Sequence, residues 1–196
     1  MNKSIFTLLS FFIVASCGSP SGPTYDLKSY DTESIGGGAK LVSYKDNLGL
    51  YLAKGQVING VRNGTWNTFH PGTNNIKTLT TYINGRKSGA EIALDENGRI
   101  VELNEFKNDV PHGLAIKYRF GRVLEEMNYK DGQLNGPFKI YNEQAKLQRS
   151  GSFKNGKQHG LLQYYDDNGN VTLEYTYENG EKVSGGIVQP SVEETQ

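Results

Sequence analysis

The sequence predicts an all-β protein, an antiparallel meander of tandem β-hairpins of about 24 residues that together form a single elongated, twisted sheet. Three observations predict this fold. The glycine of an Asn-Gly or Asp-Gly step recurs along the chain, a second glycine follows each step after four residues, and apolar and polar residues alternate between the steps. Because a period of about 20–50 residues is typical of repeat arrays, the pattern favours stacked units over a globular enzyme with a single cleft.

Two series of glycines mark the expected structural turns. The first series is Gly60, Gly85, Gly132, Gly156 and Gly180, with Asp109 in the one missing slot, and the second is Gly64, Gly89, Gly113, Gly136 and Gly160. Both central residues of a type I′ turn need a positive φ, which Gly, Asn and Asp adopt most readily. An Asn-Gly step between alternating apolar residues is therefore the strongest short signal for a hairpin.

The strand pattern is clearest in residues 171–178, where four apolar residues alternate with Thr and Glu. A period of two with one apolar and one polar face predicts a half-buried antiparallel strand. A shorter strand is expected over residues 161–165, followed by a second turn over 166–169. Each repeat is thus two strands and two turns, and residues 40–59 are expected to form a shortened first unit.

Aromatic residues recur at fixed places in the repeat and are expected to stack into ladders across the sheet. One series stands three residues before the first glycine, as Tyr82, Phe106, Tyr129, Phe153 and Tyr177, and another stands five residues after the second, as Phe69, Leu94, Tyr118, Tyr141 and Tyr165. A single-layer sheet has little material to cover an apolar face, so part of the ladders is expected to stay open as a binding surface. The candidates for that surface are Trp66, Tyr82, Tyr118, Tyr129, Tyr141, Tyr164, Tyr165 and Tyr177. The alternative is that all of them face a core and are structural.

The start of the chain predicts export. Lys3 supplies a short basic start, residues 5–15 are apolar except for Thr7 and Ser10, and small residues precede Cys17. An apolar run of about 11 residues cannot span a bilayer, which needs about 20. The pattern predicts a cleaved secretory signal over residues 1–16.

The four residues 14–17, Val-Ala-Ser-Cys, resemble the lipobox of bacterial lipoproteins. The resemblance implies that the Cys17 thiol is diacylglycerylated, that the signal is cut before it, and that the new amino terminus is acylated. Three acyl chains exceed the two signals that suffice for stable anchoring. The alternative is a plain signal peptide with an incidental cysteine, although Cys17 is the single cysteine and has no disulfide partner within the chain.

The remaining domain boundaries follow from composition. Residues 17–38 are rich in Gly, Ser and polar side chains, and we expect a lipidated cysteine followed by a flexible tether. Residues 39–186 form the repeat array, and residues 187–196 are polar and acidic and are expected to be a disordered tail.

Charge and motifs exclude several classes of function. Cleavage of the signal removes Lys3 and no acid, which leaves 20 basic and 21 acidic side chains, a net charge near −1. This balance does not predict a nucleic-acid partner. The sequence has no Gly-x-Ser-x-Gly elbow, phosphate loop, zinc-ligand spacing or dinucleotide glycine pattern, and His70, His112 and His159 are expected to be turn residues rather than metal ligands. We therefore expect no enzyme, no cofactor and no metal.

Residues 155–165, Asn-Gly-Lys-Gln-His-Gly-Leu-Leu-Gln-Tyr-Tyr, resemble the variant MORN repeat, a hairpin unit of the form Asn-Gly-x-x-x-Gly-x-aromatic-x-x-Tyr. Residues 63–66, Asn-Gly-Thr-Trp, and 135–138, Asn-Gly-Pro-Phe, match part of it, and the resemblance covers residues 52–186. Bacterial chains with these repeats are often described as antitoxin components, and eukaryotic relatives of the repeat lie beside membranes or act as scaffolds.

The resemblance and the lipobox together imply a non-enzymatic binding or scaffold module anchored in a bacterial cell envelope. Its expected partners are the membrane, through the lipid, and a protein or a glycan, through the repeat surface. Gly18 is not the aspartate associated with retention in the inner membrane, which favours the outer membrane and the periplasmic side. The alternative function is an antitoxin or immunity-type protein that neutralises a partner effector.

Overall fold

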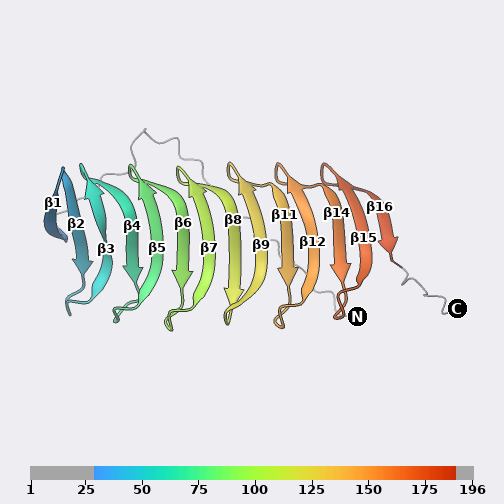
Figure 1. The fold of residues 1–196 in the computed structure, drawn as a ribbon, viewed down its shortest axis with the longest axis horizontal. Helices are drawn as coiled ribbons and strands as arrows, with labels where there is room; N and C mark the ends of the chain where they lie inside the picture. The colour runs from blue at the N-terminus through green and yellow to red at the C-terminus, as the bar shows by residue number, and fades with distance from the viewer. Residues whose placement is uncertain (1–28, 189–196) are drawn as a thin grey trace.

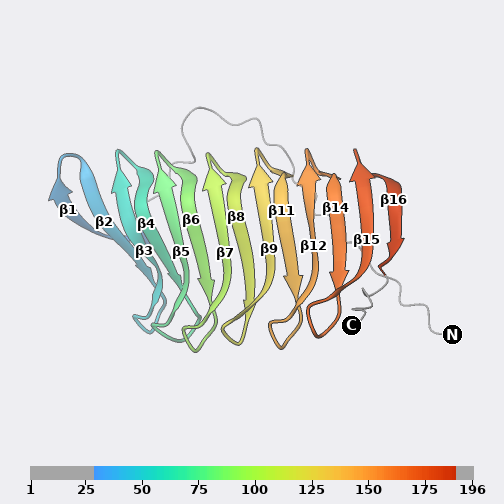
Figure 2. The same ribbon diagram turned by 45° about the vertical axis from the view of Figure 1, so that its right-hand side comes forward.

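The computed structural model describes residues 29–188, which form one open antiparallel sheet without a helix (Figure 1). The strands are β1 Asp31–Gly36, β2 Ala39–Lys45, β3 Tyr51–Ile58, β4 Val61–Phe69, β5 Ile76–Ile83, β6 Arg86–Leu94, β7 Ile100–Lys107, β8 Val110–Arg119, β9 Arg122–Lys130, β10 Gln133–Leu134, β11 Gly136–Tyr141, β12 Leu147–Lys154, β13 Lys157–Gln158, β14 Gly160–Tyr165, β15 Val171–Glu178 and β16 Glu181–Ile187. Each strand pairs with its neighbours in sequence, except that the short β10 and β13 pair only with β9 and β12. The predicted meander of hairpins is confirmed. The sheet twists along its length, so that β1 and β2 stand at an angle to β15 and β16 (Figure 2).

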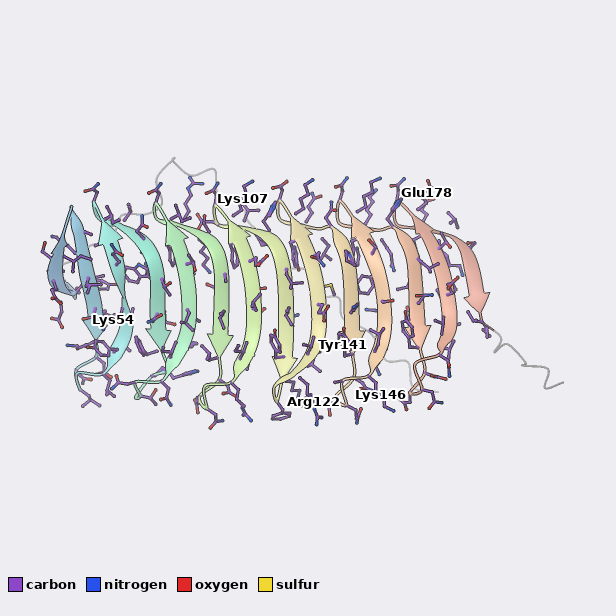
Figure 3. All side chains as sticks on the ribbon, in the orientation of Figure 1. Lys54, Lys107, Arg122, Tyr141, Lys146 and Glu178 are labelled. Carbon is purple, nitrogen blue, oxygen red and sulfur yellow. The ribbon has the colours of Figure 1, made fainter. Side chains whose placement is uncertain are left out.

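All turns lie on two opposite edges of the sheet. The turns that hold the first series of glycines form one edge, which we call the Asn-Gly edge, and Lys107 and Glu178 mark it in Figure 3. At this edge the first turn residue and the glycine both have a positive φ, for example 51° at Asn155 and 77° at Gly156. Asp109, in the slot without glycine, has a φ of 70°. The turn chemistry expected from the sequence is thus the one observed.

The opposite edge, near Arg122 and Lys146 in Figure 3, uses a different device. Asp46, Asp95, Asn142 and Asp166 each begin a turn there, and the side-chain Oδ1 of each accepts two backbone N–H groups from residues two and four further on. These Asx turns cap the backbone N–H groups of the hairpin loop, and two of the four loops also contain an Asn-Gly step, at residues 97–98 and 168–169. We call this the Asx edge.

The second series of glycines lies inside the sheet. Gly64, Gly89 and Gly113 sit in bulges where three residues of one strand oppose a single residue of the strand before it. Gly136 and Gly160 begin β11 and β14 at the corresponding point. All five have a positive φ, from 70° at Gly64 to 115° at Gly136. These glycines therefore bend strands rather than reverse the chain.

One face of the sheet carries most of the tightly packed residues, and we call it the aromatic face. Val42, Val57, Trp66 and Tyr82 form a cluster at its N-terminal end, against which Tyr30 packs. Toward the C-terminal end, Phe138 and Leu162 are each 3% exposed. At both ends a glycine lies directly beneath an aromatic ring. A Cβ on Gly55 would come within 2.4 Å of Trp66, and one on Gly151 within 2.7 Å of Phe138, so these rings lie directly on the backbone.

The structure corrects both expected boundaries of the array, because residues 31–36 and Ile187 also belong to the sheet. Residues 31–36 form β1 and pair with β2, so the expectation that a flexible tether runs to Gly38 is wrong for this segment. Gly37 has a φ of 60° in the hairpin turn that follows. At the other end the array continues through Ile187, which pairs with Leu173. The expected signal, Cys17 and residues 189–196 lie outside the described residues.

Candidate functional site

The eight candidate binding residues do not form one surface. Trp66 is 2% and Tyr82 is 9% exposed, so placing these two on an open binding surface is wrong. Their rings fill the N-terminal cluster, where Arg62 lies over both at 4.4 and 5.1 Å. The single-layer sheet still buries them because the Trp66 ring lies on the backbone of Gly55 in the adjacent strand, and both rings pack against the cluster and Arg62.

The other six candidates are half-buried and divide between the two faces. Tyr129, Tyr164 and Tyr177 share the aromatic face, where the ring centroids of Tyr164 and Tyr175 lie 6.4 Å apart. Tyr118, Tyr141 and Tyr165 lie at bulges near the Asx edge and belong to the opposite face. There Tyr141 Oη donates to Glu126 at 3.1 Å, and Tyr165 Oη lies 2.9 Å from Ser150 Oγ.

Between the two packed ends, the aromatic face holds a hollow of about 790 Å³ that opens to solvent. Its apolar lining includes Phe106 from β7, Ala115 from β8, and Met127 and Tyr129 from β9. The turn between β12 and β13 closes it on the Asn-Gly edge. The volume lies within the range of about 300–1,000 Å³ that is typical of ligand sites.

The hollow exists because one position of the repeat, which elsewhere holds a large apolar side chain, does not hold one in the middle of the sheet. The residue two places after the second glycine is large and apolar at both ends of the sheet, as Trp66, Phe138 and Leu162. In the two repeats between them the same position holds Glu91 and Ala115. Ala115 pairs with Met127 on one side and with Asn104 on the other, so no ring lies at this position between Phe106 and Tyr129.

Polar groups line the side of the hollow toward the Asx edge. Lys117 Nζ lies 3.2 Å from Glu125 Oε1, which partly neutralises both charges. Glu102 pairs with Lys117 across the sheet but makes no ion pair, and the side chains of Glu102 and Asn104 make no hydrogen bond with any described residue. Glu102 and Asn104 therefore leave hydrogen-bonding capacity unused within residues 29–188 on this side of the hollow.

The surroundings of Tyr129 in the hollow change the pKa of its phenol. Burial raises the pKa of its phenol above the usual 10.0, and the negative charge of Glu125 raises it further. Lys117 offsets part of this effect, and Glu102 adds to it. The phenol therefore stays protonated and uncharged through neutral pH, where it offers a ring face and a hydroxyl.

His112 and His159 have a structural role in the turns of the Asn-Gly edge, whereas His70 lies in the turn between β4 and β5, where its Nε2 is 3.0 Å from the Leu94 carbonyl oxygen. His112 Nδ1 accepts the backbone N–H of Asp131 at 3.3 Å, and His159 Nδ1 lies 3.5 Å from the backbone N of Asn179. Ser88 occupies the same repeat position, and its Oγ accepts the N–H of Asn108. Each of these side chains thus contacts the turn of the following repeat. Among residues 29–188, no three His, Cys, Asp or Glu side chains converge as metal ligands would.

Sequence reasoning missed the hollow, although a signal for it was present. The aromatic position of the repeat motif is replaced by Glu91 and Ala115, and a gap in an otherwise regular pattern points to a local change of surface. Only the strand register shows that Phe106 and Tyr129 flank this gap on the same face.

Comparisons with known proteins add little to this geometry. No protein-family model matches the chain, and no curated protein matches it. Among solved structures, it is similar to TarM of S. aureus, in a mutant form crystallised with Fondaparinux, alpha-GlcNAc-glycerol and UDP, with 10% identity over 80% of this chain and a TM-score of 0.28. A second TarM crystal structure gives 11% identity at the same TM-score. The chain spans about a fifth of TarM, 21% of its length, and the similarity is too low to indicate a common fold or activity. Within the described range, no helix is long and apolar enough to span a membrane.

Proposed function

We propose that this chain is a non-enzymatic binding module, anchored to a bacterial membrane through lipid on Cys17, and that it holds a partner in the hollow of the aromatic face. The observation that carries the binding role is the hollow itself. A repeat that elsewhere fills its face with rings leaves about 790 Å³ open between Phe106 and Tyr129. Apolar walls with a few polar groups are the usual make-up of a recognition site.

The chemistry of the hollow supports binding rather than catalysis. Of its two lysines, Lys117 is paired with Glu125, and the raised pKa of Tyr129 moves that phenol further from acting as a base at neutral pH. The lipid anchor rests on the resemblance of residues 14–17 to a lipobox and on the apolar run before them.

Two variants of the full chain test the proposal. Cys17→Ser should move the protein from the membrane pellet to the soluble fraction, and continued pelleting after a carbonate wash would contradict the anchor. Ala115→Phe should close the hollow, because it restores the ring found at Trp66 and Phe138. In a crosslinking pulldown from intact membranes, the partner should be captured by the parent and lost with Ala115→Phe.

Two controls complete the pulldown. Glu178→Gln, on the Asn-Gly edge away from the hollow, should capture as the parent does (Figure 3). Equal capture by the parent and Ala115→Phe would contradict the hollow as the site. A captured toxic effector would identify the chain as a neutralising partner, and an envelope-assembly protein would identify a scaffold.

A further inference from the structure

We infer that the hollow binds a basic, extended segment of a partner protein, with a lysine or arginine side chain placed on the ring of Tyr129 and facing the Glu102 carboxylate. The inference rests on the proposed binding function and adds the chemistry of the partner. The supporting observation is that, in each of the two preceding repeats, a cationic side chain of the protein itself lies over the equivalent aromatic ring.

The position two residues after the first glycine supplies a cation to the aromatic ladder in two successive repeats. Arg62 lies over Tyr82 with 5.1 Å between its guanidinium carbon and the ring centroid, and Lys87 Nζ lies 4.9 Å from the centroid of Phe106. Lys87 Nζ also donates to Glu91, so this cation is held between a ring and a carboxylate. Such pairs are stabilising because the ring face is electronegative.

The next repeat keeps the ring but lacks the cation. Tyr129 is the following member of the ladder, and the position that holds Arg62 and Lys87 is occupied by Pro111. Ala115 stands in the place of Glu91. Removal of one cation and one carboxylate side chain leaves the space over Tyr129 open, and Glu102 at its border has no ion-pair partner among the described residues. An incoming cation would repeat the arrangement of Lys87, Glu91 and Phe106.

The charge of the lining matches a basic ligand. Four carboxylates, Glu102, Glu105, Asp109 and Glu125, line the hollow against two ammonium groups, Lys117 and Lys157, a net charge of −2. The whole chain has a net charge of 0, so the negative charge is local. Because Lys117 is already paired with Glu125, it does not neutralise Glu102 by an ion pair.

The length of the hollow favours a peptide over a small cation. The lining runs from β7 to the turn after β12, which are four strand spacings apart in the sheet. At about 4.8 Å per spacing this is roughly 19 Å, the length of about six residues of extended chain. A segment of this length places one basic side chain over Tyr129 and leaves backbone and neighbouring side chains to contact the rest of the lining.

The test is a binding titration of the full-length protein in detergent micelles, followed by fluorescence anisotropy. The probe is a labelled hexapeptide of alternating glycine and lysine, and the matched control probe has glutamine in place of each lysine. The lysine probe should bind with an affinity that falls as salt is added, and the glutamine probe should bind at least about tenfold more weakly.

Three variants locate the binding. Glu102→Gln, which keeps shape and removes the charge, should weaken the lysine probe about tenfold, the size expected for one charge-assisted contact. Ala115→Phe should abolish binding while the circular dichroism spectrum and melting temperature of the parent are kept or raised. Glu178→Gln removes an exposed carboxylate on the Asn-Gly edge of β15, away from the hollow, and should bind as the parent does.

The inference is overturned if both probes bind equally, if Glu102→Gln binds the lysine probe as the parent does, or if a neutral hexasaccharide binds in the hollow instead. The proposed function has a separate test. If crosslinking still captures a partner that Ala115→Phe loses, while no lysine or arginine hexapeptide binds, then the binding role stands and the basic partner is wrong.

Discussion

The indole of Trp66 lies directly on the backbone of Gly55, so close that a Cβ on Gly55 would come within 2.4 Å of Trp66 Cδ2. The indole Nε1 donates to the carbonyl of Gln56 at 2.8 Å, which fixes the ring in this place. Phe138 on Gly151 repeats the relationship in the second packed end of the face. A glycine beneath a ring is how this single-layer sheet buries large side chains without a second layer.

Gly55→Ala should therefore destabilise the protein by about 1–3 kcal/mol, because the new methyl group forces the indole out of its position. The measurement is the free energy of unfolding from denaturant titration. Gly186→Ala is the matched control, because Gly186 lies in β16 with no neighbouring atom within 4 Å of the added Cβ. Equal loss of stability in the two variants would mean that close approach of the ring is not the cause.

Phe138→Ala should lower the free energy of unfolding by about 3–5 kcal/mol, the range for truncation of a large buried aromatic ring. Phe138 is 3% exposed, whereas Phe120 is 73% exposed in the turn that joins β8 and β9. Phe120→Ala should change stability by no more than about 0.5 kcal/mol. A similar loss in both would contradict the burial of Phe138.

Gly156→Val should destabilise the protein by about 1–3 kcal/mol, because Gly156 has a φ of 77° that a β-branched residue rarely adopts. No atom lies within 4 Å of an added Cβ, so the cost is one of backbone conformation alone. Gly156→Asn should lower the free energy of unfolding by less. Gly186→Val is the control, because Gly186 does not have a positive φ. Equal melting temperatures for Gly156→Val and Gly186→Val would contradict the turn assignment. Gly37→Val should also destabilise the protein, because Gly37 has a φ of 60°.

The Asx edge should give the protein a defined acid response. Backbone and side-chain hydrogen bonds from Asn170 hold the pKa of Asp166 below the usual 3.8, and those from Arg99 do the same for Asp95. A carboxyl group with a lowered pKa contributes stability that is present above its unfolded value and is lost as the pH falls through the folded value. Both contributions should therefore disappear below pH 3.8.

The measurement is a carbon-13 NMR titration of the two carboxyl groups, in which each midpoint should fall below 3.8. Asp166→Asn should keep the turn, since Asn142 makes the same two backbone contacts, and should remove its share of the acid response. A midpoint at or above the usual value for either carboxyl group would contradict the Asx-turn account.

Part of the candidate site was predictable, because ladder positions follow from spacing. Tyr129 lies on the aromatic face of the sheet as a regular member of its ladder. The burial of Trp66 and Tyr82 was not predictable, because burial depends on which glycine or side chain each ring meets across the strands. The position of Tyr141 on the opposite face was predictable, because Tyr141 lies three residues after Phe138 in β11 and successive side chains of a strand point to opposite faces.

The sequence by itself determined the architecture, because each hairpin is closed by local chemistry. A positive φ at Asn155 and Gly156, or two backbone contacts to Asp166, needs no distant residue. The tertiary structure alone decided what the face of the sheet presents. Register brings Gly55 under Trp66, adds β1 to the array, and places Phe106, Ala115 and Tyr129 around one hollow. These are relations between residues on different strands, and side-chain packing between strands is set by pairing, not by any local pattern.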